Sequence, residues 1–179
     1  MKNEFKIISI RGRLAFGLIF FEELLKKYNV ELLTNKFLND FVEKLWEVCS
    51  GSNLESIEEF VNEVAPYSIL DDSPNNDFNE YDFLSFEEAN DLRRFYLTLP
   101  QDIVSAMNFL TEIAFGNLYG NTGSYSSITY NGLVNLLAIY KHNGISFKDS
   151  ELKVKSSFEE LNGWGDPRPK DIWKEMCEM

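Results

Sequence analysis

Few side chains in this sequence have the types and spacing that catalysis requires. The 179 residues include one histidine, His142, and two cysteines, Cys49 and Cys177. A nucleophilic Ser/His/Asp or Cys/His arrangement would have to use His142, which lies where a helix is expected to end and where the helix dipole stabilises a partly positive ring. We therefore expect a surface or capping histidine. The same counts exclude a zinc site built from several His and Cys ligands, and two widely separated cysteines are typical of free thiols in a reducing cytosol.

Residues 71–82 resemble a calcium-binding loop in the order of their oxygen donors. The donors at its first, third, fifth, ninth and twelfth positions are Asp71, Ser73, Asn75, Asn79 and Asp82. The sixth position is Asn76 instead of glycine, and Asp82 replaces the longer glutamate that can bind through both oxygens. Pro66 also separates this loop from the helix before it. These departures favour a plain surface loop, and we expect no metal or other cofactor.

A glycine-rich stretch, residues 116–124, has backbone amides that could face a phosphate. It lacks a following Gly-Lys-Ser/Thr and does not follow a predicted strand, so a connection between helices is the better interpretation. An enzyme with its site in residues 116–127, helped by Arg11, Arg13 or Tyr125, remains an alternative with few acid–base candidates. We prefer a structural role for both arginines, in which they pair with acids near the start of a helix.

The carboxylates are concentrated in one part of the chain. Residues 31–100 contain 16 acidic and 4 basic side chains, which accounts for the whole formal net charge of −12. Residues 55–91 hold 12 acids and no lysine or arginine. Steps of three and four place four of these carboxylates on one helix face, namely Glu55, Glu58, Glu59 and Glu63. A solvated face explains this pattern in part, but the enrichment favours a shaped negative surface that suits a basic protein partner and disfavours nucleic acid.

Aromatic residues lie in the same acidic segment, in a loop expected over residues 67–84. Such rings are typical anchors of protein interfaces, although they could equally hold the loop to the core. We predict Tyr67, Phe78 and Tyr81 as anchors. The predicted partner-binding surface as a whole comprises Glu59, Glu63, Tyr67, Asp71, Asp72, Asp77, Phe78, Glu80, Tyr81 and Asp82.

Apolar residues at helical spacing predict the elements that carry these side chains. A central buried helix runs from Leu14 to Tyr28. We expect Thr34 to cap a second helix that stops at Gly51, and the Ser52–Glu55 spacing to form a capping box that opens a third helix, ended by Pro66.

Later helices follow from similar signals. Ser85–Glu88 is a second capping-box match, Pro100 suits the first residue of the next helix, and Asn143-Gly144 ends another. Shorter helices are expected over residues 150–161 and 170–177, and only residues 5–10 look strand-like, without an evident partner strand. The sequence therefore predicts an all-α protein, a single domain over residues 1–179 with seven or eight helices in an irregular bundle.

Two stretches resemble a known class of proteins. Residues 10–17 (IRGRLAFG), which run into the long apolar helix, and the late turn at residues 163–167 (GWGDP) look like the predicted all-α immunity proteins of bacterial polymorphic toxin systems. Such proteins are encoded beside a secreted toxin and neutralise it by binding. The resemblance implies a cytoplasmic inhibitor without catalytic activity, and it does not identify the toxin. Taken with the acidic segment, it leads to the hypothesis that the protein covers the active or substrate-binding surface of a basic toxin, such as a nuclease, with its acidic face.

Other functions remain open, including an acidic helical scaffold and a dimerising regulator. The most apolar window, residues 14–21, is far shorter than the roughly 20 residues that a membrane span needs. No basic region followed by an apolar stretch and a cleavage site begins the chain. We therefore expect a cytoplasmic protein with no membrane partner.

Overall fold

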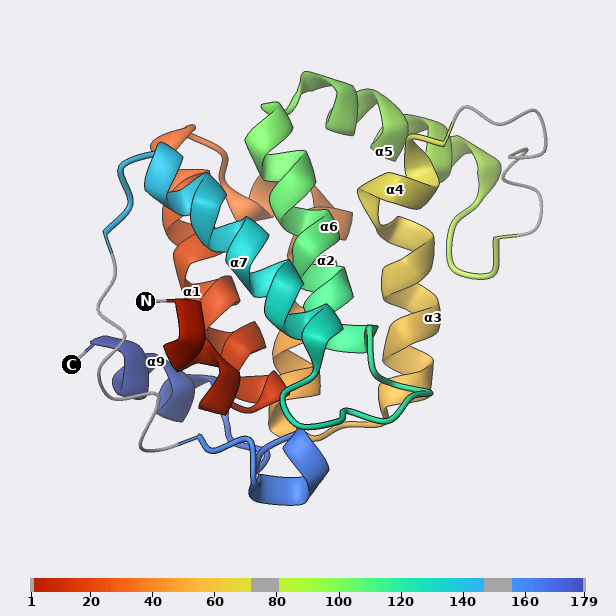
Figure 1. Cartoon of the computed structure of the whole chain (residues 1–179). Coiled ribbons are helices and arrows are strands. Elements are labelled where there is room, and N and C mark those ends of the chain that lie inside the picture. The colour runs from red at the N-terminus through yellow and green to blue at the C-terminus, as the bar shows by residue number, and fades with distance from the viewer. Residues whose placement is uncertain (1, 72–80, 147–155, 179) are drawn as a thin grey trace.

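The computed structural model describes residues 2–71, 81–146 and 156–178 (Figure 1). Eight α-helices and three 3-10 helices make up the described part of the chain, without a β-strand, which confirms the predicted all-α fold. The α-helices are α1 Ile10–Lys27, α2 Lys36–Ser50, α3 Leu54–Val64, α4 Pro66–Ile69, α5 Phe86–Thr98, α6 Gln101–Phe115, α7 Ser127–His142 and α9 Lys170–Glu178. The 3-10 helices are η1 Lys2–Ile7, η2 Leu32–Thr34 and η3 Glu160–Gly163.

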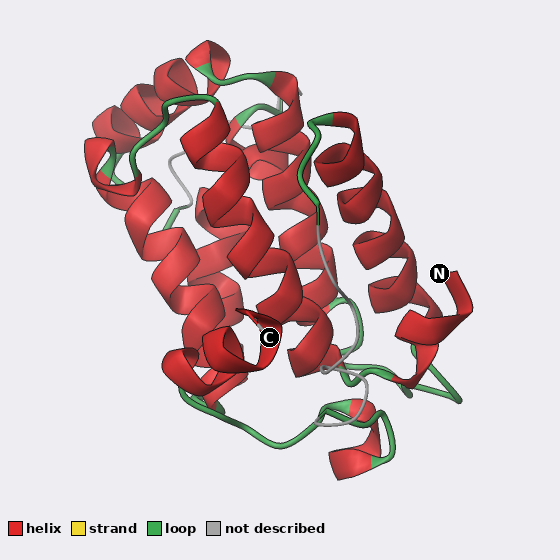
Figure 2. Ribbon diagram, turned by 90° about the vertical axis from the view of Figure 1, so that its left-hand side faces the viewer, coloured by secondary structure: helices red, strands yellow, loops and turns green. Residues whose placement is uncertain are grey.

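Helix α1 is the centre of the bundle, as the sequence predicts. It contacts α2, α6, α7 and α9, and its side chains are buried on nearly every side. Figure 2 shows the described chain as helices joined by loops and turns. It begins at Ile10, earlier than the apolar run suggests, because the Ser9 hydroxyl accepts the Gly12 N–H at 3.1 Å. A Cβ atom at Gly17 would lie 2.9 Å from both Leu110 and Leu136, so this glycine allows α6 and α7 to approach α1 closely.

The caps of α2 and α3 differ from the predicted ones by one residue. Asn35, not Thr34, caps α2, since its side-chain oxygen accepts the N–H groups of Phe37 and Leu38, while Thr34 ends η2. Gly51 ends α2 as predicted, with a φ of 86° that favours glycine.

Helix α3 is likewise capped by an asparagine. Asn53, not Ser52, caps it by accepting the Glu55 N–H at 3.2 Å, so the predicted capping box is absent there. The prediction of a capping box was correct for α5, where Ser85 and Glu88 bond reciprocally.

Two prolines lie at helix boundaries in ways that the sequence predicts only in part. Helix α3 ends before Pro66, which then opens the single turn of α4, where its missing N–H costs nothing. Pro100 is the cap of α6 and not its first helical residue.

The N-terminal segment is not a strand. Residues 2–7 form η1, and only Ile8 pairs with Ser157, in an isolated antiparallel bridge. Ser9 N–H donates to the Ser156 carbonyl at 3.0 Å, so the C-terminal part of the chain supplies the partner that was not evident from the sequence. Of the short helix expected over 150–161, residues 150–155 lie outside the described residues, and the remainder forms turns and the start of η3.

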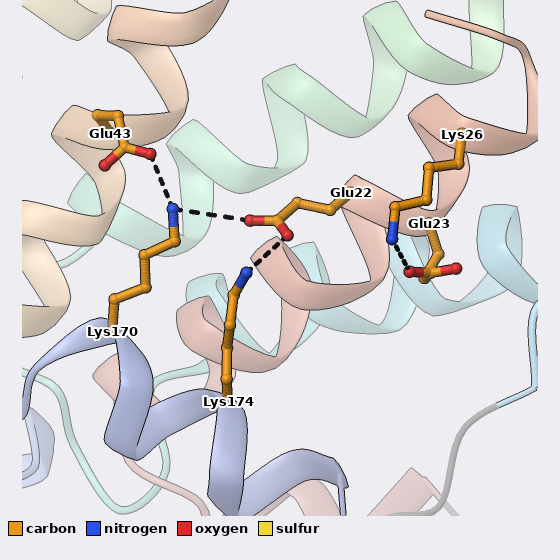
Figure 3. Close-up of polar contacts among 6 residues, drawn as sticks. All are labelled: Glu22, Glu23, Lys26, Glu43, Lys170 and Lys174. Carbon is orange, nitrogen blue, oxygen red and sulfur yellow. Dashed lines mark hydrogen bonds and ion pairs between the residues drawn. The ribbon is translucent and has the colours of Figure 1, made fainter. Parts of the chain in front are cut away.

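Helix α9 confirms the helix predicted over residues 170–177 and packs on α1 and α2. Its Trp173 is fully buried, and the indole N–H donates to the Cys49 carbonyl at 3.3 Å. Figure 3 shows Lys170 and Lys174 converging on Glu22 of α1, at 3.8 and 2.8 Å, and Lys170 also reaching Glu43 of α2 at 2.7 Å. The C-terminal helix is thus held by one large apolar side chain and a small ion-pair network.

Candidate functional site

Helix α3 carries the acidic face that the sequence predicts. Glu55 and Glu59 are exposed one turn apart, and Glu58 beside them is partly buried. The opposite face is buried through Ile57 and Val61. No described side chain donates a hydrogen bond or forms an ion pair with the carboxylates of Glu55 and Glu59. The helix therefore presents negative charge to solvent that the described part of the protein does not neutralise.

Glu63, predicted as part of the binding surface, is instead a buried structural group. Its side chain is only 9% exposed, and its two oxygens accept three backbone N–H groups from the segment before α5. The donors are Asp82 at 2.9 Å, Phe83 at 2.8 Å and Leu84 at 2.6 Å. Because this carboxylate already holds the chain together, it is not available to a partner, and the prediction for Glu63 was wrong.

Tyr119 joins the acidic face from the loop between α6 and α7. The side chain is 78% exposed, and its hydroxyl donates to Glu58 Oε2 at 2.6 Å. This hydrogen bond, followed by desolvation and the charges of Glu58, Glu55 and Glu59, raises the pKa of Tyr119 to about 12. Figure 1 shows the α6–α7 loop extending to the N-terminal end of α3. No signal in the sequence links this tyrosine to α3, since three helices, α4, α5 and α6, lie between them in the chain.

Tyr67, a predicted anchor, lies beside the same helix. Its ring is 47% exposed, its hydroxyl donates to Asn62 Oδ1 at 2.5 Å, and its backbone N–H donates to Asn108 Oδ1. Burial, with a further contribution from the carboxylate of Glu58, raises the pKa of Tyr67 to about 12. Two exposed tyrosines thus approach α3 near Glu58. We call Glu55, Glu58, Glu59, Tyr67 and Tyr119 together the α3 surface.

The rings of the segment before α5 have mixed roles. Phe83 is 45% exposed but packs edge-on against Phe60 of α3, with ring centroids 5.6 Å apart. Tyr81 is partly buried against the core. Phe83 thus holds the segment to α3 and Tyr81 packs against the core, so the alternative interpretation of the loop aromatics applies to these two rings.

The remaining predicted binding residues are only partly covered by the structure. Asp71 and Asp82 are exposed at the two ends of the calcium-like stretch, residues 71–82. The Arg93 guanidinium donates to the backbone carbonyls of Ile69 and Asp71, which fixes the chain at the end of α4. Asp72, Asp77, Phe78 and Glu80 lie outside the described residues, as does most of the calcium-like loop.

The two arginines of the enzymatic alternative are structural. Arg13 is fully buried, and burial lowers its pKa to about 10. Its guanidinium donates to Phe5 O, Lys6 O, Ser126 O and Thr129 Oγ1, at 3.2, 3.1, 3.2 and 2.7 Å. Arg11 donates to the carbonyls of Val48 and Gly165. Both therefore bind backbone carbonyls and not the carboxylates that we expected, since no acid accepts a hydrogen bond from either guanidinium in the described part of the chain.

The glycine-rich loop borders two open cavities, and Tyr125 is the one candidate acid–base group in their described lining. The larger, about 600 Å³, lies between this loop and the turn at residues 158–164, and no titratable side chain lines it. Tyr125 lines the smaller one, about 280 Å³, and the Lys6 ammonium lies 4.5 Å from its ring centroid. Burial raises the pKa of the Cys49 thiol, and His142 is exposed at the end of α7, as predicted. Among the described residues, no three His, Cys, Asp or Glu side chains gather as a metal site would require.

No helix in the described ranges has the length and apolar character that crossing a bilayer demands. Comparisons of the chain with protein-family models, with curated proteins and with solved structures found no match.

Proposed function

We propose that the protein is a non-catalytic inhibitor that binds a basic bacterial toxin domain and covers its active or substrate-binding surface. The observation that carries the proposal is the α3 surface, where the exposed carboxylates of Glu55 and Glu59 lie beside the exposed ring of Tyr119. The resemblance of residues 10–17 to immunity proteins supports the same function and favours action in the cytoplasm.

Charge complementarity is the physical basis of this proposal. A toxin that acts on nucleic acid needs lysine and arginine side chains to bind phosphates. Carboxylates on α3 would occupy the same cations, steer the two proteins together and raise the association rate, with a steep dependence on ionic strength. The tyrosines would add contact area at the centre of the interface, where desolvated aromatic side chains contribute most of the binding energy.

The test is the association rate with a purified toxin domain encoded beside this chain's gene. A variant carrying Glu55→Lys, Glu59→Lys and Asp82→Lys reverses three exposed acids next to α3. We expect slower association, by about tenfold or more at low salt, and a weaker salt dependence in stopped-flow measurements.

The matched control changes the net charge equally at a distance from α3. It carries Glu31→Lys, Asp171→Lys and Glu175→Lys, all at exposed positions. At physiological ionic strength this control should slow association much less than the α3 variant, because screening there makes nearby charges dominate over distant ones. Equal rates for the α3 variant and the unchanged protein would refute the proposal.

A further inference from the structure

The ring of Tyr119 is held in place although it is exposed. Its hydroxyl is bound to Glu58, so the side chain is restrained at both ends while 78% of its surface remains open. An exposed aromatic ring that is already ordered loses little conformational entropy when a partner covers it. This is the property expected of an interface anchor, and Tyr119 combines it with a location beside three carboxylates.

The environment of the ring suits a cation. The charges of Glu58, Glu55 and Glu59 all act on the Tyr119 hydroxyl and help to raise its pKa. A cation stacked on the ring would lie close to these carboxylates, and the electron-rich face of an aromatic ring attracts cations as well. No cation of the described part of the chain lies over Tyr119.

The protein uses the same contact elsewhere to hold its own cations. The Lys6 ammonium lies 4.5 Å from the ring centroid of Tyr125, and the Arg13 guanidinium lies 5.2 Å from that of Phe158. These internal pairs are formed within the chain. Tyr119 offers a comparable ring without such a cation at the surface, next to carboxylates that have no described cationic partner.

We propose that the α3 surface binds an arginine side chain of its protein partner, with the guanidinium stacked on Tyr119 and paired with the carboxylates of Glu55 and Glu59. The inference rests on the proposed function and specifies its partner chemistry. Arginine fits better than lysine because its planar guanidinium can stack on a ring and donate hydrogen bonds to carboxylates along its edges at the same time. The centre of the interface is then the start of α3 and the α6–α7 loop, and not the segment at residues 71–82.

Short oligo-arginine and oligo-lysine peptides of equal length are suitable probes. We expect the unchanged protein to bind the arginine peptide more tightly in calorimetric titrations at low salt. Tyr119→Leu, which keeps an apolar side chain but removes the ring, should weaken arginine-peptide binding about two- to fivefold and change lysine-peptide binding less. Tyr119→Phe keeps the ring and should retain most of the preference for arginine.

The control is Phe86→Leu, which removes another exposed ring, one that lies within the acidic residues 55–91 but away from Glu58, and should leave both affinities unchanged. Circular dichroism checks that each variant is folded. A Tyr119→Leu variant with the full arginine preference would overturn the inference about Tyr119.

A double variant, Glu55→Lys with Glu59→Lys, separates this failure from failure of the proposed function. If reversal of these two charges weakens both peptides while Tyr119→Leu has no effect, the acidic surface stands and only the arginine site is wrong. If charge reversal leaves both affinities unchanged, the α3 surface does not attract basic peptides, and the proposed function loses its physical basis together with the inference.

Discussion

At the level of single residues, glutamates of one helix have opposite roles. Glu59 is exposed to solvent, whereas Glu63, one turn later, is buried under the segment that precedes α5. Helical periodicity places both on the polar side of α3, away from Ile57 and Val64. Their roles differ because the segment before α5 covers Glu63 and not Glu59. Three backbone N–H groups of this segment need an acceptor once they leave water, and the Glu63 carboxylate supplies it.

We expect Glu63→Ala to lower the free energy of unfolding by about 3 kcal/mol, since it leaves three backbone N–H groups without their charged acceptor. Urea denaturation followed by tryptophan fluorescence measures this change. Glu59→Ala, an exposed change on the same helix, should alter stability by less than about 0.5 kcal/mol. Similar losses for the two variants would show that Glu63 does not organise the segment before α5.

The contact between Tyr119 and Glu58 should be visible in an alkaline titration. The ordinary tyrosine pKa of 10 is raised to about 12 in the folded protein, first of all by the hydrogen bond to Glu58. The protonated phenol is therefore favoured by folding, and its contribution to stability is present below pH 10 and lost as the pH rises through about 12.

The difference in tyrosinate absorbance between the unchanged protein and Tyr119→Phe isolates this group. We expect a midpoint near pH 12 and a lower midpoint when Glu58 is replaced by glutamine. Glu87→Gln, on α5, serves as the control and should leave the midpoint in place. An unchanged midpoint in Glu58→Gln would argue against the hydrogen bond in solution.

At the level of elements, adjacent polar side chains compete to accept the free backbone N–H groups at the start of a helix. The spacing of a capping box occurs at both Ser52 and Ser85, but only Ser85 forms one. Asn53 directly follows Ser52, and its side-chain oxygen accepts the N–H of Glu55. Asparagine is at least as good a cap as serine, so α3 begins one residue later than the pattern indicates.

Asn53→Ala should therefore reduce the free energy of unfolding by about 1 kcal/mol, whereas Ser52→Ala should have an effect below about 0.5 kcal/mol. Chemical denaturation monitored by far-ultraviolet circular dichroism compares the two. Ser85→Ala is the positive control, with an expected loss of about 1 kcal/mol, because that cap is formed. A larger loss for Ser52→Ala than for Asn53→Ala would contradict the assigned cap.

At the level of the whole molecule, the acidic helix is distant from both ends of the chain. The acidic helix α3 lies on the opposite side of the bundle from α9 and the N-terminal segment (Figure 1). Near the N-terminus the cation Arg13 is buried, where it joins η1, α1 and the start of α7 through backbone carbonyls and Thr129. The exposed acids of α3 thus lie far from Arg13, a basic side chain that serves the interior.

Arg13→Lys tests that interior role. Lysine keeps the charge but cannot reach four acceptors from one planar group, so we expect a loss of about 2–4 kcal/mol in the free energy of unfolding. Arg94→Lys, on an exposed part of α5, should change it by less than about 0.5 kcal/mol. Both are read from urea denaturation. Equal stability of Arg13→Lys and the unchanged protein would show that the four hydrogen bonds do not need a guanidinium.

The sequence by itself determined the all-α fold, the central helix α1, most helix ends and the concentration of acid in residues 31–100. These features are local, because apolar periodicity, glycine stops and charge composition depend on residues within a few turns of one another. Several helix boundaries were predicted one residue away from their true position. Local patterns do not decide between adjacent caps, such as Ser52 and Asn53 at the start of α3.

Only the tertiary structure decided which of these residues form one surface. Periodicity gives the direction of a side chain from its helix axis but not what covers that direction. The burial of Glu63, the contact of Tyr119 with Glu58 and the carbonyl partners of Arg13 all depend on segments distant in the sequence. Their positions follow from how the helices pack around α1, and that packing decides which carboxylates are left for a partner.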